Sequence, residues 1–511
     1  MPHVVTQACC GDASCVYACP VNCIHPTPEE PGFGTSEMLY IDPATCVDCG
    51  ACVSACPVGA IVPGHRLPDE QARFADINAA HFEPAGADAA RFPVDPSRRL
   101  PLAPIDHPRR LAADSPLSVG IVGSGPSAMY AADELLRHPQ VSVTVYERLD
   151  RPFGLARFGV APDHLATRSV MRLFDDIAGH PRCDIRLGVA VGTDVTLDEV
   201  RNRHQAVIWA GGAPTDRRLD LENATAPGVL SATALVGWYN GHPDHTDLDV
   251  DLSSSRAVVI GNGNVALDVA RILTADPESL ADTTLAPRAL TALRSSAIEE
   301  VVVLGRRGPA HAAFTVPELV GLVDTGVNLV VDTADLASAA ELVIDDVTTR
   351  TKLDLLAEVA GRPPADGPRI RLAFHRAPAA IRVDNDGRAT GLAVDHTRVG
   401  ASGTVESTGI SETIETSLVL TSIGYRGVAV PGLPFDDTRG VIPHDAGRVV
   451  DHDTPVPGVY VTGWIKRGPS GFIGTNKTDS AETVGSLLAD YEAGRLPAAR
   501  PARRRVLSRL G

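Results

Sequence analysis

The sequence predicts an α/β protein in which a small cysteine-rich α+β module precedes two doubly wound parallel sheets. Strand-like and helix-like apolar patterns alternate along most of the chain, and a glycine-rich turn follows a buried strand at two places. Nine of the ten cysteines lie before Pro57, which marks off the N-terminal module. The 511 residues leave room for about three folding units of ordinary size.

The overall composition is that of a globular protein, with 44% hydrophobic and 21% charged residues. A net charge of −17 argues against nucleic acid as a partner, because binding phosphates needs a basic face. No apolar run reaches the length of about 18 residues that a membrane helix needs, and Met1–Asp12 lacks the pattern of a secretory signal. We therefore expect a cytoplasmic protein without a membrane partner.

Two cysteine runs have nearly the same spacing of cysteines, and each ends in Cys-Pro. The second, Cys46–Pro57 (CVDCGACVSACP), has the spacing C-x2-C-x2-C-x3-C-P, in which three cysteines bind one iron–sulfur cluster and the fourth crosses to its neighbour. In the first, Cys9–Pro20 (CCGDASCVYACP), Asp12 replaces the second cysteine and Cys10 follows Cys9. Because the fourth cysteine of each run binds the cluster of the other run, two ligand sets follow. They are Cys19, Cys46, Cys49 and Cys52 for one [4Fe–4S] cluster, and Cys9, Cys15 and Cys56 for the other cluster.

The second of these ligand sets has only three certain thiolates. It predicts a [3Fe–4S] cluster, or a [4Fe–4S] cluster completed by Asp12 or Cys10. Zinc is disfavoured because zinc sites have no need of a C-x3-C-P tail, and disulfides are disfavoured because an export signal is lacking. Residues 1–84 resemble a bacterial-type seven- or eight-iron ferredoxin, with Asp69–Phe82 as its closing amphipathic helix.

The first glycine-rich turn lies in Ser118–Ala128 (SVGIVGSGPSA), where a buried strand runs into G-x-G-x-x-A and a helix. Glycines there let the backbone approach a pyrophosphate, whose charge is stabilised at the helix N-terminus. Glu147 ends the next strand, where a carboxylate accepts from a ribose hydroxyl. This order of elements predicts a Rossmann-like dinucleotide site.

The second turn, in Ala257–Ala266 (AVVIGNGNVA), repeats the strand–turn–helix pattern and predicts a second nucleotide. The strand that follows ends in Arg306 and Arg307 and not in an acid. Guanidinium groups match a 2′-phosphate that an acid would repel, so the pair predicts a preference for NADPH.

The segment Arg151–His164 (RPFGLARFGVAPDH) resembles the signature of the adrenodoxin-reductase-like ferredoxin–NADP reductases. The resemblance extends over residues 116–490 and includes a flavin-binding loop at Gly463–Lys477. It implies FAD at the first site, with the contacts Gly123, Gly125, Ser127, Ala128, Glu147, Leu155, Val191, Trp464, Gly471, Phe472 and Ile473. It implies NADPH at the second, with the contacts Arg217, Asn262, Gly263, Asn264, Val265, Arg306, Arg307, Glu318 and Gly471.

The predicted domain order joins these parts. It is a ferredoxin module with two iron–sulfur clusters (1–84), a Pro/Ala-rich linker (85–114), the first part of the FAD domain (115–215), the NADP domain (216–368), the second part of the FAD domain (369–497) and a basic tail (498–511). Strands with hairpin turns such as Asp384–Gly387 are expected in Ile370–Glu415.

The predicted function is that of a ferredoxin–NADP(+) reductase fused to a ferredoxin. Hydride passes from NADPH to FAD, and single electrons then pass to the clusters and to an external acceptor such as a cytochrome or another ferredoxin. By resemblance only, His164 is a candidate for the proton path. We expect a monomer.

Other classes of flavoprotein share parts of this pattern. A pyridine nucleotide–disulfide reductase is disfavoured because Cys183 is the only cysteine after Pro57. An electron-input subunit like the small subunit of glutamate synthase, and a non-catalytic redox sensor, stay open as alternatives.

Charge is distributed unevenly along the chain. Residues 1–65 contain six acidic residues and no Lys or Arg, whereas the chain from Arg495 onward contains six arginines and no acid. This asymmetry suggests that an acidic module docks on a basic face formed in part by Arg500–Arg509.

Overall fold

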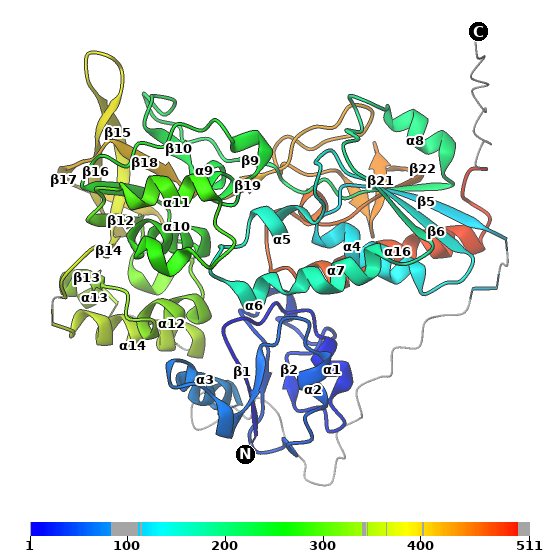
Figure 1. Cartoon of the computed structure of the whole chain (residues 1–511), viewed down its shortest axis with the longest axis horizontal. Helices are drawn as coiled ribbons and strands as arrows, with labels where there is room; N and C mark the ends of the chain where they lie inside the picture. The colour runs from blue at the N-terminus through cyan, green and yellow to red at the C-terminus, as the bar shows by residue number, and fades with distance from the viewer. Residues whose placement is uncertain are drawn as a thin grey trace.

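The computed structural model describes residues 2–82, 111–112, 115–339, 344, 346–363, 365–400 and 403–498. Within them, two sheet domains lie side by side and the cysteine-rich module lies beneath their junction (Figure 1). Apart from Leu111 and Ala112, the predicted linker 85–114 is outside the described residues. The predicted tail 498–511 is also outside them, apart from Ala498.

The module has the predicted α+β fold. Its strands form two short antiparallel pairs, β1 (His3–Val5) with β4 (Ile61–Pro63) and β2 (Ile24–His25) with β3 (Tyr40–Ile41). One short helix lies within each cysteine run, α1 (Ser14–Ala18) in the first and α2 (Ala51–Ala55) in the second.

The closing helix predicted over Asp69–Phe82 is present as α3 (Arg73–Phe82), and the first residues of the predicted range form a 3-10 turn at Asp69–Gln71. Its buried Asn78 joins the two strand pairs, because Asn78 Oδ1 accepts from the backbone N–H groups of Val5 at 3.2 Å and Ile41 at 2.9 Å. One side chain thus satisfies backbone donors on both pairs.

The first sheet domain is built on seven strands in the order β20-β21-β22-β8-β5-β6-β7. The central strands are parallel and buried on both faces, which explains their continuous apolar sequences. The strands are β5 (Leu117–Val122), β6 (Val141–Tyr146), β7 (Cys183–Arg186), β8 (Ala206–Trp209), β20 (His444–Asp445), β21 (Arg448–Asp451) and β22 (Thr454–Val461). Its helices are α4 (Pro126–Leu136), α5 (Gly154–Phe158), α6 (Leu165–Arg168), α7 (Val170–Ala178), α8 (Leu197–Arg203), α15 (Trp464–Arg467) and α16 (Thr475–Glu492).

The second sheet domain has six parallel strands in the order β10-β18-β11-β12-β14-β13. They are β10 (Val229–Ser231), β11 (Arg256–Ile260), β12 (Glu300–Gly305), β13 (Leu329–Val331), β14 (Arg369–Phe374) and β18 (Leu418–Thr421). Its helices are α9 (Ala232–Tyr239), α10 (Asn264–Thr274), α11 (Pro287–Arg294), α12 (Val316–Asp324), α13 (Thr333–Ala337) and α14 (Val347–Ala360).

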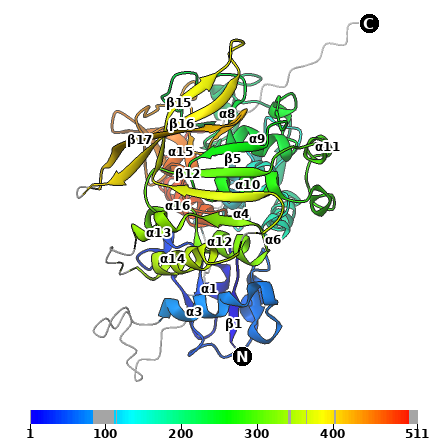
Figure 2. The ribbon, with the colours of Figure 1, turned by 90° about the vertical axis from the view of Figure 1, so that its left-hand side faces the viewer.

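This second sheet continues past the predicted boundary at residue 368. Strands β14 and β18 belong to it, and between them lies an antiparallel sheet of β15 (Arg376–Val383), β16 (Ala389–Val399) and β17 (Val405–Glu415) (Figure 2). The expected strands and the hairpin turn at Asp384–Gly387 are present, but they extend the second domain and not the first. The chain enters and leaves the second domain through the pair β9 (Thr215–Asp216) and β19 (Tyr425–Arg426).

Ion pairs join the module to the second domain, and the module contributes the base in some of them and the acid in another. Arg73 of the module pairs with Asp324 at 2.8 Å and with Glu358 at 2.8 Å, while Glu37 of the module pairs with Lys352 at 3.5 Å. The described interface therefore mixes both signs of charge. Arg500–Arg509, on which the docking prediction partly rests, lies outside the described residues, so that prediction stays untested. In the part of the chain that the structure describes, no helix is long and apolar enough to span a bilayer.

Candidate functional site

The two glycine-rich turns open into one continuous cavity of about 1630 Å³. A site for one small ligand commonly has a volume of about 300–1000 Å³, so this cavity has room for more than one ligand. It is lined by residues of both sheet domains and also by Ala8, Cys9 and Cys10 of the module.

The first turn joins β5 to α4 and meets the requirements of a pyrophosphate site. Gly123 has φ +97°, and a side chain there would lie 2.6 Å from the carbonyl oxygen of Ala210. Beside Gly125 no protein atom lies within 4 Å of the place that a Cβ would occupy, so a ligand can approach the backbone. Ala128, expected at this site, is fully buried and does not line the cavity; it belongs to the apolar cluster between α4 and the sheet.

Glu147 is fixed at the edge of the cavity. Its Oε2 accepts from the backbone N–H of Ser124 at 3.0 Å and from Ser124 Oγ at 2.6 Å, and its Oε1 accepts from Leu149 N–H at 2.9 Å. A carboxylate has lone pairs for about four hydrogen bonds, so acceptor capacity for a ribose hydroxyl remains.

The expected flavin loop forms another wall of the cavity. Trp464 Nε1 donates to the carbonyl of Ser470 at 3.1 Å, and the Trp464 ring lies with its centroid 5.0 Å from that of Tyr425. Phe472 N–H donates to Thr475 Oγ1 at 2.9 Å, where α16 begins. The expected residues that line the cavity on this side are Ser127, Leu155, Val191, Trp464, Gly471, Phe472 and Ile473.

The second turn joins β11 to α10. No protein atom lies within 4 Å of a Cβ built on Gly263, and Asn264 Oδ1 accepts from Thr315 N–H at 2.8 Å. Arg306 and Arg307 follow β12 and have exposed side chains at the cavity. The remaining expected residues Arg217, Asn262, Val265 and Glu318 also line it. All expected nucleotide contacts except Ala128 thus share one cavity.

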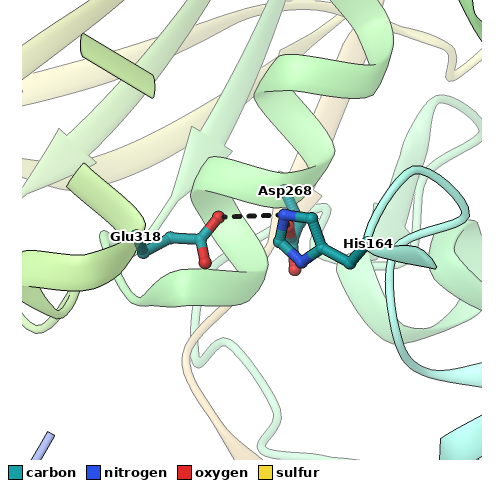
Figure 3. Close-up of side chains that lie close together, drawn as sticks. All are labelled: His164, Asp268 and Glu318. Carbon is teal, nitrogen blue, oxygen red and sulfur yellow. Dashed lines mark ion pairs between the residues drawn. The ribbon is translucent and has the colours of Figure 1, made fainter. Parts of the chain in front are cut away.

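His164 lies beside two acids on the second domain (Figure 3). Its Nε2 is 3.8 Å from Glu318 Oε1 and 3.8 Å from Asp268 Oδ1. Burial is the main cause that raises the pKa of Glu318 to about 7, and the nearby charge of Asp268 adds to it. A His, Asp and Glu in such a group can bind a metal ion.

The buried guanidinium of Arg271 already supplies the cation for this group. It donates to Glu318 Oε1 at 2.9 Å, to Asp268 Oδ1 at 2.6 Å and to Asp163 Oδ2 at 2.8 Å. Burial alone would lower the pKa of Arg271, but the three acids raise it well above its usual value. We read the group as an ion-pair network, and the roles of Arg271, Asp268 and Asp163 were not predicted. Asp268 and Arg271 are three positions apart on a helix, and this spacing could have predicted the ion pair between them.

The four cysteines assigned to the [4Fe–4S] cluster, Cys19, Cys46, Cys49 and Cys52, line one small cavity. Cys23 lines it too, with its Sγ 3.4 Å from that of Cys19. All ten cysteines lie among the described residues, and none of them forms a disulfide there. Four convergent thiols fit an iron–sulfur cluster.

The other three cysteines, Cys9, Cys15 and Cys56, gather with Asp12 nearby. Burial is the main cause that raises the pKa of the Cys9 thiol, to about 11, and the neighbouring Cys56 and Asp12 raise it further. The buried Asp12 carboxylate accepts from Ser14 Oγ and lies 3.8 Å from Lys477 Nζ. Three thiols with a carboxylate or Cys10 beside them fit either of the cluster types expected here.

Family models match both parts of the chain. Two models described as "4Fe-4S dicluster domain" match residues 8–60 and 38–88, and one described as "NAD(P)-binding Rossmann-like domain" matches residues 121–181.

Several known proteins and solved structures are similar to this chain. A "Probable ferredoxin/ferredoxin--NADP reductase" of Mycobacterium bovis is 53% identical, over 98% of this chain and 86% of that protein. The mitochondrial NADPH:adrenodoxin oxidoreductase of Homo sapiens is 42% identical, over 74% of this chain and 79% of that protein. The structure of Mycobacterium tuberculosis FprA in complex with NADPH is 40% identical, with a TM-score of 0.70, over 75% of this chain and 87% of that chain. The cysteine module, the two nucleotide turns and this similarity along almost the full length agree, and the chain belongs to the family of the ferredoxin/ferredoxin–NADP reductases.

Proposed function

We propose that this chain oxidises NADPH and passes the electrons one at a time through its own iron–sulfur module to an external acceptor. One observation carries the proposal: both nucleotide turns and Cys9 and Cys10 of the module line the same cavity. The family membership supports the same electron-transfer activity. Bound FAD would accept hydride from NADPH and release single electrons, the form in which iron–sulfur clusters carry charge.

The residues of the cavity would bind and orient the two nucleotides. Gly125 and the N-terminus of α4 would hold the FAD pyrophosphate, and the Glu147 carboxylate would accept from its ribose hydroxyl. Arg306 and Arg307 would donate charge-assisted hydrogen bonds to the 2′-phosphate of NADPH. Leu155 and Trp464 would cover the flavin ring and keep water from it.

We assign the proton path to His164 Nε2 and Glu318 Oε1. The 3.8 Å between these atoms is longer than a hydrogen bond, and hydrogen bonds of a catalytic site often shorten only when the substrate binds. Arg271 Nη1 donates to the same oxygen, Glu318 Oε1, at 2.9 Å and holds the carboxylate in place.

The cluster sites complete the relay. Cys19, Cys46, Cys49 and Cys52 would bind a [4Fe–4S] cluster. Cys9, Cys15 and Cys56 would bind a [3Fe–4S] cluster, or a [4Fe–4S] cluster with Asp12 or Cys10 as fourth ligand. We propose a cytochrome or another ferredoxin as the acceptor and a monomer as the active form.

Anaerobic titration of the purified protein with NADPH tests the proposal. We expect the flavin absorption to bleach, EPR signals of reduced clusters to appear, and added cytochrome c to be reduced over many turnovers. NADH should be a much poorer donor. Protein without flavin absorption, or clusters that NADPH leaves oxidised, would contradict the proposal.

The same titration separates the two alternatives. A redox sensor would be reduced once without steady turnover of cytochrome c. An electron-input subunit would turn over its physiological acceptor only after a large partner is added.

A further inference from the structure

The module and the flavin loop meet next to the first cysteine run. Gly474, which immediately precedes α16, donates its backbone N–H to the carbonyl of Cys10 at 2.8 Å. Lys477, in the first turn of α16, donates from Nζ to Ser14 Oγ at 2.7 Å. The loop that carries the residues expected to contact the flavin is thus hydrogen-bonded directly to the loop that carries Cys9 and Cys10.

Only glycine permits this approach. A side chain on Gly474 would place its Cβ 2.6 Å from the Cβ of Asp12 and closer still to the Asp12 backbone nitrogen. A Cβ atom essentially never lies closer than 3.0 Å to a non-bonded heavy atom, so any other residue at position 474 would push the two loops apart.

The two cluster sites differ in their surroundings. At the site of Cys9, Cys15 and Cys56, Asp12 and Cys15 are both only 5% exposed, and Cys9 lines the nucleotide cavity. At the site of Cys19, Cys46, Cys49 and Cys52, by contrast, Cys49 is exposed, and the neighbouring Val47 is 58% exposed. The first site faces the reductase, and the second site faces solvent.

We propose that the two sites act in a fixed order. The site of Cys9, Cys15 and Cys56 (the inner site) receives electrons from the flavin, and the site of Cys19, Cys46, Cys49 and Cys52 (the outer site) delivers them to the acceptor at the surface around Val47. This inference rests on the proposed function. Each NADPH oxidised yields NADP+, one proton and two electrons; the electrons pass singly through the inner and then the outer site and reduce two molecules of a one-electron acceptor.

Removing one cluster at a time tests the order. In Cys15→Ser, we expect NADPH to bleach the flavin but to leave the outer cluster oxidised, although dithionite still reduces it. In Cys49→Ser, NADPH should reduce the inner cluster, while reduction of cytochrome c is lost. EPR spectra of anaerobically frozen samples report each cluster separately.

The possible outcomes are distinguishable. An outer cluster that NADPH reduces in Cys15→Ser as fast as in the unchanged protein would overturn the order. A flavin that stays oxidised with NADPH in the unchanged protein would instead contradict the proposed function and not the order.

Two substitutions that keep every ligand serve if the cysteine variants do not fold. Gly474→Ala should slow cluster reduction several-fold relative to flavin reduction in stopped-flow traces.

Val47→Arg should slow reduction of cytochrome c, a basic protein, several-fold and leave NADPH-dependent cluster reduction unchanged, because a rim charge mainly changes the association rate. The control is Ile410→Arg at an equally exposed position on β17, which should have no effect. Equal effects of Val47→Arg and Ile410→Arg would contradict the exit surface.

Discussion

Arg271 Nη1 donates to Glu318 Oε1 at 2.9 Å, and the same guanidinium contacts Asp163 across the domain boundary at 2.8 Å. One side chain of α10 therefore connects the first sheet domain, where Asp163 lies, to α12 of the second. Glu318 keeps a raised pKa in spite of this partner, because burial and Asp268 disfavour its charge. The charge at this end of the nucleotide cavity is consequently pH-dependent.

We expect Glu318→Gln to change how the KM for NADPH depends on pH. The pKa of Glu318 is raised to about 7, so below pH 7 the carboxyl is protonated and matches glutamine, and above pH 7 it is negative. The negative carboxylate repels the phosphates of NADPH, and repulsion between like charges separated by on the order of 10 Å weakens binding by about two- to tenfold. The ratio of the wild-type KM to that of Glu318→Gln should therefore rise from near one at pH 6 to several-fold at pH 8, measured with ferricyanide as acceptor.

The matched control is Glu358→Gln, which removes a carboxylate that pairs with Arg73 at the module interface. Its KM for NADPH should follow the wild-type pH dependence. A Glu318→Gln ratio that stays constant between pH 6 and pH 8 would contradict the assignment.

Arg306→Ala and Arg307→Ala should each reduce the preference for NADPH over NADH. A hydrogen bond to a charged group contributes about 1.5–3 kcal/mol, which corresponds to roughly a 10- to 150-fold loss of kcat/KM with NADPH. The value with NADH, which lacks the 2′-phosphate, should change little. Arg294→Ala, which removes an exposed arginine paired with Glu278, is the control and should leave both values unchanged.

The features that could be predicted from the sequence are local ones. The cysteine spacings, the strand–turn–helix patterns and Arg306–Arg307 depend on neighbouring residues. The predicted nucleotide contacts other than Ala128 line one cavity, and the four cysteines of the outer site line another. The contacts of Arg271 with Asp163 and of Gly474 with Cys10 join residues far apart in the chain, and no spacing encodes such pairs. The return of β18 to the second sheet was missed for the same reason, since an apolar strand does not identify its neighbours.

Asp490→Asn should destabilise the first sheet domain. The buried Asp490 carboxylate accepts from Tyr460 Oη at 2.7 Å and from Arg448 Nε at 2.8 Å. Burial alone would raise its pKa, but the hydrogen bonds from Arg448, Tyr460 and Arg495 lower it below the usual value. Breaking a buried ion pair costs about 3–5 kcal/mol, so the thermal transition at pH 7 should shift downward by several degrees.

The sign of the pH effect follows from the lowered pKa. The ionised Asp490 stabilises the fold fully above the unfolded-state pKa of about 3.9, and this contribution is lost as the pH falls through the lower folded value. The difference in Tm between Asp490→Asn and wild type should therefore be constant above pH 5 and shrink below pH 4. Asp437→Asn, whose side chain is 91% exposed, should show no difference at either pH.

Asp12→Cys should add one iron per chain. A thiolate binds iron more firmly than a carboxylate. The Asp12 carboxylate is also held by Ser14 and lies near Lys477, so we expect the inner site to contain a three-iron cluster in the unchanged protein. Iron analysis should show the gain, and the EPR signal of an oxidised [3Fe–4S] cluster should disappear. Asp12→Asn, which removes the charge without supplying a thiolate, should retain that signal. An unchanged iron content in Asp12→Cys would mean that a fourth iron is already bound, and loss of that iron in Cys10→Ser but not in Asp12→Asn would identify Cys10 as its ligand.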